Sequence, residues 1–171
     1  MAKIDSQKII GPIMRFVNMR GIIALKDGML AILPLTVVGS LFLIIGQLPF
    51  EGLNQAIASV FGETWTEPFM QVYSGTFAIM GLISCFSIGY SYAKNSGVEP
   101  LPAGVLSLSS FFILLKSSYV PAKGEPIGDA IAKVWFGGQG IIGAIIIGLV
   151  VGAIYTVFIQ RHIVIKMPEQ V

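Results

Sequence analysis

The chain has 171 residues, of which 54% are hydrophobic and only 12% are charged, and its mean hydropathy is +0.81. Soluble globular domains carry about 25% charged residues, so this composition excludes an ordinary soluble domain and favours a protein that crosses a membrane several times. The net charge of +2 gives no basic surface for nucleic acid, and a single cysteine, Cys85, excludes a disulfide framework within the chain.

The first 26 residues predict an amphipathic helix on the membrane surface. Basic side chains lie mostly on the face opposite a cluster of apolar ones at helical spacing. The apolar cluster consists of Ile9, Ile10, Ile13, Met14 and Val17. Pro12 marks either the start of this helix or a kink in it. A frayed, solvated leader is the alternative interpretation of the segment.

Four uncharged runs come next, and each predicts a transmembrane helix. They are residues 28–50, 68–93, 100–115 and 134–160. The third run has only 16 residues and begins with Pro100 and Pro102, so it needs shelter from neighbouring helices or a snorkelling Lys116. The expected fold class is all-α: a polytopic membrane protein with four transmembrane helices and the interfacial helix at its start.

The two long connections, residues 51–67 and 116–133, are each expected to hold a short amphipathic helix on the outer membrane surface. In the first connection the apolar residues fall on one stripe, and Trp65 suits the headgroup level. The first stripe is Leu53, Ile57, Val60 and Phe61; the second is Ile127, Ile131, Val134 and Trp135. With both termini in the cytoplasm, inside segments carry eight basic residues and outside loops three, so the distribution of Lys and Arg favours this orientation.

The last run carries small residues at every fourth position, which fall along one face of a helix. This small-residue row consists of Gly140, Ala144, Gly148 and Gly152. Small residues let another helix backbone approach closely in a membrane, so we expect the row to be a helix-packing surface. Its partner is either another helix of the same chain, which we prefer, or the copy of this helix in a dimer.

The four runs contain no Asp, Glu, Lys, Arg or His. Ion-coupled and drug exporters usually carry such a group inside the membrane, so this class is disfavoured. The sequence shows no phosphate-binding loop, no metal-spaced His/Cys cluster and no nucleophile motif, so we expect no catalytic residue, cofactor or metal. His162 could be a proton shuttle or phosphoryl acceptor, but without a partner carboxylate in the helix we favour an interface cation.

Polar residues within the runs are expected mainly to bond to their own or a neighbouring helix. Sugar binding would use similar hydroxyl and amide groups together with aromatic side chains. The polar residues in question are Thr36, Ser40, Gln47, Tyr73, Ser74, Thr76, Ser84, Ser87, Tyr90 and Gln139, besides the serines of the third run.

Several segments in order resemble the membrane permease (IIC) component of the bacterial sugar phosphotransferase system, in its lactose/cellobiose/diacetylchitobiose branch. The first span, with Lys26-Asp27-Gly28 and then Leu33-Pro34-Leu35-Thr36, is similar to that of the family. So is the second, with Tyr73-Ser74-Gly75-Thr76-Phe77-Ala78-Ile79-Met80. Gly148-Leu149-Val150-Val151 resembles the family's fourth span, and Ile163 to Val171 resembles the stretch after that span.

The resemblance implies a homodimeric permease in the bacterial cytoplasmic membrane that takes up a disaccharide. A cytoplasmic IIB component phosphorylates the sugar during uptake. Family chains are more than twice as long, and their later half carries His-Gly and Asn-Glu-Pro motifs at the sugar. Neither motif occurs here, because Ile163 follows His162 and Val98 precedes Glu99-Pro100. We therefore expect residues 1–171 to be the interface half, without the sugar-carrying half; a free-standing four-helix scaffold is the alternative.

Overall fold

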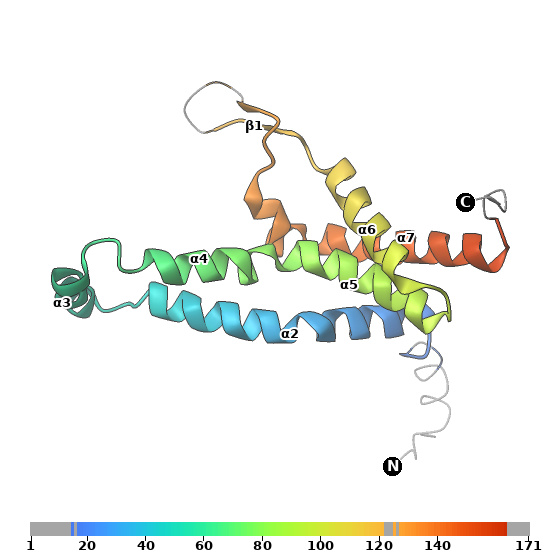
Figure 1. Ribbon diagram of the computed structural model, residues 1–171, viewed down its shortest axis with the longest axis horizontal. Helices are drawn as coiled ribbons and strands as arrows, with labels where there is room; N and C mark the ends of the chain where they lie inside the picture. Colours follow the sequence, from blue (N-terminus) through green and yellow to red (C-terminus); the bar gives the residue numbers. More distant parts are fainter. Residues whose placement is uncertain (1–14, 16, 122–124, 126, 164–171) are drawn as a thin grey trace, which may run out of the picture.

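The computed structural model describes residue 15 and residues 17–121, 125 and 127–163. Most of the predicted surface helix over residues 1–26 lies outside the described residues. The described chain is a bundle of apolar helices in which α2, Arg20–Gly46, lies alongside α4, Glu67–Gly75, and α5, Met80–Asn95, which run back along it (Figure 1). Helices α6, Pro100–Leu114, and α7, Ile141–Gln160, pack against α5 and against each other.

Helix α2 begins at Arg20 rather than at residue 28 and ends at Gly46 rather than at residue 50. Charges near one end of an apolar helix do not stop it, because long basic side chains can reach back to the membrane surface. Pro34 lies inside the helix without ending it. The helix stops at Gly46, three residues before Pro49, a sequence that does not favour continuation.

Helix α3, Glu51–Phe61, occupies the place in the first connection where a short helix was predicted. It lies beyond the far end of α2 and α4 (Figure 1). Its apolar residues Val60 and Phe61 are 74% and 76% exposed.

The second uncharged run forms a single apolar path, Glu67–Asn95, but not one continuous helix. α4 ends at Gly75, a 3-10 turn η1 spans Phe77–Ile79, and α5 comes next. Thr76 leaves the helical region with φ −126° and ψ −88°, and its Oγ1 donates a hydrogen bond to the Val72 carbonyl oxygen at 2.6 Å. A threonine that bonds back to its own helix after a glycine disfavours regular continuation.

Helix α6 has 15 residues and is about 22 Å long at 1.5 Å per residue, shorter than the ~30 Å hydrocarbon core. Among the described residues, three segments are long and apolar enough by themselves to cross a membrane: Arg20–Gly46, Glu67–Asn95 and Gly138–Gln160. The sequence-based count of four spans therefore depends on α6.

The prediction of a short helix in the second long connection was wrong. Strands β1, Ser118–Tyr119, and β2, Ile127–Gly128, form an antiparallel hairpin that projects from the bundle after α6 (Figure 1). Ile127 pairs with Tyr119, and Asp129 adopts φ 54°, a left-handed conformation that a helix does not accommodate. The first helical element after the hairpin is a 3-10 turn, η2, at Lys133–Phe136.

Helix α7 begins at Ile141, later than the start of its uncharged run. A 3-10 turn η3, Gly138–Gly140, precedes it, and Gly137 lies outside the helical region with φ −95° and ψ −144°. Glycine is the poorest helix former after proline, so a helix through this segment would be costly.

Helix α5 is the centre of the bundle and contacts α2, α6 and α7. Its buried residues are mainly small: Gly81, Ser84, Cys85, Ile88, Gly89, Ser91 and Ala93. Ile88 is fully buried, with Gly28 of α2 on one side and Gly148 of α7 on the other. Side chains this small let three helices approach α5 closely, as is typical of helix packing in membranes.

Candidate functional site

The small-residue row lies on the side of α7 that faces α5. Ala144, Gly148 and Gly152 are buried in the helix, whereas Gly140 is the buried residue that caps it. A methyl group on Gly148 would lie 2.9 Å from the Cys85 carbonyl oxygen, and one on Gly152 would lie 2.8 Å from Tyr92 Cβ. Thr156 extends the buried row by one turn and was not singled out from the sequence.

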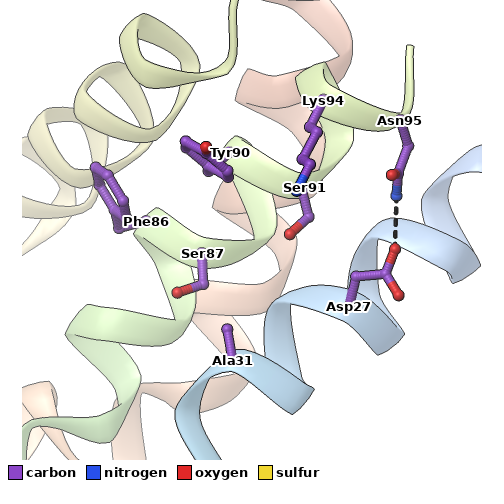
Figure 2. Close-up of a pocket in the computed structure, with 8 residues that line it drawn as sticks. All are labelled: Asp27, Ala31, Phe86, Ser87, Tyr90, Ser91, Lys94 and Asn95. Atoms are coloured by element: carbon purple, nitrogen blue, oxygen red, sulfur yellow. Dashed lines mark hydrogen bonds between the residues drawn. The ribbon is translucent and has the colours of Figure 1, made fainter. Parts of the chain in front are cut away.

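A groove of about 390 Å³, with both polar and apolar lining residues, lies between α2 and α5 (Figure 2). We call it the α2–α5 groove. Helix α2 contributes two residues and α5 contributes six. The lining residues are Asp27, Ala31, Phe86, Ser87, Tyr90, Ser91, Lys94 and Asn95.

The Asp27 carboxylate organises one end of this groove. Asn95 Nδ2 donates a hydrogen bond to Asp27 Oδ2 at 2.9 Å, as Figure 2 shows, and Lys26 Nζ lies 3.1 Å from Asp27 Oδ1. The bond joins residues 68 positions apart and ties the start of α2 to the end of α5. Each carboxylate oxygen keeps further lone-pair capacity beyond these contacts.

Aromatic side chains form the other end of the groove. The rings of Phe86 and Tyr90 are stacked, with centroids 6.1 Å apart and planes 23° apart. Phe86 also packs on α6, because a methyl group on Gly104 would lie 2.7 Å from its ring. The groove therefore combines flat apolar surface with hydroxyl, carboxylate, amide and ammonium groups.

A second groove, of about 540 Å³, lies where the break after α4 meets the glycine segment before α7. Its lining includes the stacked pair Tyr73 and Phe77, with centroids 5.8 Å apart, together with Ser74 and Gln139. We call it the α4–η3 groove. It repeats the combination of a stacked aromatic pair with neighbouring polar groups.

Sequence reasoning named Tyr73, Ser74, Ser87, Tyr90 and Gln139 as polar residues of the runs but did not bring them together. It assigned no site role to Asp27, Ser91, Lys94 or Asn95, and Asp27 entered only as part of the Lys26-Asp27-Gly28 motif. The signal that could have found the groove is the repeated pair of an aromatic residue followed by serine, at Phe86-Ser87 and Tyr90-Ser91.

Among the described residues, no group of three or more His, Cys, Asp or Glu side chains could hold a metal ion. His162 is exposed at the end of α7, with φ 54°, and its backbone N–H bonds to the Ile159 carbonyl oxygen. Its assignment as an interface cation remains a prediction.

Apolar helices packed through small residues, with polar groups gathered in two grooves, define part of an integral membrane protein. The family described as "Phosphotransferase system, EIIC" matches residues 26–171, and the chain belongs to this family of permease components. The resemblance found in the sequence is thereby confirmed.

Individual relatives agree with this assignment. The chain is 38% identical to the lichenan permease IIC component of Bacillus subtilis, over 99% of this chain and 38% of that protein. It is 37% identical to the cellobiose-specific EIIC component of Geobacillus stearothermophilus, over 92% of this chain and 36% of that protein.

The crystal structure of ChbC, the IIC component of the N,N'-diacetylchitobiose-specific phosphotransferase system, is similar with a TM-score of 0.84. The identity is 34%, over 96% of this chain and 40% of ChbC. This chain thus spans well under half the length of these relatives.

Proposed function

We propose that this chain is the interface half of a permease that takes up a disaccharide of the cellobiose, diacetylchitobiose or lactose type. Uptake is coupled to phosphorylation by a cytoplasmic IIB component. The observation that carries the proposal is the match over nearly the whole chain to sugar-specific IIC components more than twice its length. The alternative, a membrane scaffold without a part in transport, is not favoured by these matches.

The packing suits a half that acts as one rigid unit, and we assign that unit the supporting role. Gly28, Ile88 and Gly148 place three helix backbones in close contact, so these helices have little freedom to slide past one another. The outward faces of α2, α6 and α7 are apolar and suit lipid or a second copy of the chain. A homodimer built through this half is part of the proposal.

We propose four membrane crossings, with α6 as the short one and both ends of the chain in the cytoplasm. The start of α2 and the end of α7 lie at the same end of the bundle, which favours an even number of crossings (Figure 1). Two hydrogen bonds support this arrangement: Asn95 to Asp27, and Gln160 Nε2 to the Ser96 carbonyl oxygen at 3.2 Å. Helix α3 then lies on the outer surface.

The test is uptake of radiolabelled cellobiose by bacterial cells that lack their own permease but keep their IIB component. We expect uptake from a gene that continues the reading frame through a full-length IIC protein, and none from residues 1–171 alone. Uptake by the 171 residues alone would refute the interface-half assignment. Failure of the full-length protein with every disaccharide of the three types would refute the sugar permease itself.

A further inference from the structure

The α2–α5 groove is lined by hydroxyl groups that form no side-chain hydrogen bond to the described part of the bundle. Ser84 and Ser107 donate to carbonyl oxygens of their own helices, at 2.6 Å and 2.8 Å. Among the described residues, no side-chain hydrogen bond involves the hydroxyl of Ser87, Tyr90 or Ser91. Hydroxyl groups in membrane helices normally donate a hydrogen bond to a nearby backbone carbonyl oxygen. These three hydroxyls are therefore available to hydrogen-bond a ligand in the groove.

The other polar groups in the lining complement a ligand that both donates and accepts. The Asp27 carboxylate accepts hydrogen bonds, the Lys94 ammonium donates them, and the Asn95 amide does both. Lys26 already pairs with the Asp27 carboxylate at 3.1 Å, so the lining offers a ligand hydrogen-bonding groups of both kinds together with the Lys94 ammonium. A polyol, whose hydroxyls donate and accept, matches this mixture.

The aromatic end of the groove favours a cyclic sugar over other polyols. The stacked rings of Phe86 and Tyr90 form flat apolar surface beside Ser87 and Ser91. A sugar ring has an apolar face of C–H groups and a rim of hydroxyls, so it can lie against an aromatic ring while its rim reaches the serines. The volume of about 390 Å³ lies within the ~300–1,000 Å³ of ordinary small-molecule sites.

A lipid chain matches only the apolar part of this lining. Besides the aromatic pair, most of the lining residues carry polar side chains: Asp27, Ser87, Ser91, Lys94 and Asn95. Placing an acyl chain against them would leave polar groups without partners in an apolar environment, which is costly.

We propose that the α2–α5 groove is a binding site for a sugar, located in the supporting half of the permease. The inference rests on the proposed function for the identity of the sugar. Ser87 and Ser91 hydrogen-bond the hydroxyls, Asp27 and Asn95 hold one edge, and Tyr90 supports the ring face. The site gives the sugar a place of contact on this half during its passage.

The test is saturation-transfer NMR of cellobiose with the 171-residue chain in lipid nanodiscs. We expect transfer to the cellobiose protons, and an affinity at least fivefold weaker for the S87A/S91A double variant. The matched control is T36A/S40A, which removes two hydroxyls from α2 that bond only to their own helix. This control is expected to bind cellobiose as the unaltered chain does.

Absence of transfer with the unaltered chain would overturn the proposal, as would equal affinity of S87A/S91A and the control. A groove filled by lipid gives the first of these results. The melting temperature of each variant, compared with the control, shows that lost binding is not lost folding.

The two proposals fail separately. If full-length protein takes up cellobiose equally well with and without S87A/S91A and the chain shows no transfer, the groove site is wrong and the permease stands. If the chain binds cellobiose through the groove but the full-length protein transports no disaccharide, the permease is wrong and the site stands.

Discussion

Gly148 of α7 lies directly against Ile88 of α5: a methyl group on the glycine would be 3.0 Å from Ile88 Cβ. The same methyl would be 2.9 Å from the carbonyl oxygen of Cys85, which belongs to the backbone and cannot turn away. The interface between the two helices therefore has room for a hydrogen atom at position 148 and for nothing larger.

Substitution Gly148→Leu is expected to push α7 away from α5. Forcing a side chain into a close-packed interface typically costs about 1–3 kcal/mol, and contact with backbone atoms puts this case at the upper end. The apparent melting temperature in detergent and the elution profile on size exclusion measure the effect. Gly143→Leu is the matched control, because no atom lies within 4 Å of a methyl at that position. Equal melting temperatures of the two variants would contradict the close packing.

Substitution Gly28→Ala tests the other side of Ile88. The new methyl would lie 2.7 Å from Ile88 Cα, so α2 and α5 must separate. We expect a lower melting temperature even though alanine is the better helix former by about 1 kcal/mol. Gly21→Ala on the same helix, 3.9 Å from Leu149 Cδ2, is expected to be neutral or slightly stabilising. A Gly28→Ala variant as stable as Gly21→Ala would show that α2 does not pack as described.

The hydrogen bond from Asn95 to Asp27 is expected to contribute about 0.5–1.5 kcal/mol to the packing of α2 on α5. A double-mutant cycle with Asn95→Ala and Asp27→Ala measures it through the melting temperature. The double variant should be less destabilised than the sum of the two single variants. Strict additivity would mean that the bond contributes nothing. Ser59→Ala, which removes a hydroxyl bonded only within α3, is the control for lost surface polarity.

The proposed orientation is testable by cysteine labelling in a Cys85→Ala background. Glu63→Cys, just after α3, is expected to react in intact cells with a reagent that does not cross membranes. Glu99→Cys, between α5 and α6, is expected to react only after the cells are opened. Both positions are exposed, so reactivity reports the side of the membrane rather than burial. The reverse pattern would invert the proposed orientation.

The helices were predictable because an uncharged run in this chain is long enough to dominate local preference. Residues 134–160 predict a membrane helix and its row of small residues, and Ala144, Gly148 and Gly152 lie buried in α7. The break at Thr76 was not predictable in the same way. Hydropathy is continuous through it, and the break depends on one backbone conformation and one side-chain bond.

The prediction for the second connection failed for a related reason. The spacing of Ile127 and Ile131 suits a helix, but the left-handed Asp129 and the pairing of Ile127 with Tyr119 are decided by local backbone geometry. The α2–α5 groove depends on contact between Asp27 and Asn95, which lie 68 positions apart. A local sequence pattern cannot predict a contact at that separation. Its polar residues were visible in the sequence, but their assembly was not.

The central claim is that residues 1–171 support transport only together with a separate sugar-carrying half. Its most direct test is co-expression of this chain with the complementary remainder of the lichenan permease as two polypeptides, combined with cellobiose uptake and co-purification. We expect uptake when both polypeptides are present and none with either one. Uptake by this chain alone would contradict the claim, and so would the absence of uptake from a pair that reaches the membrane and co-purifies.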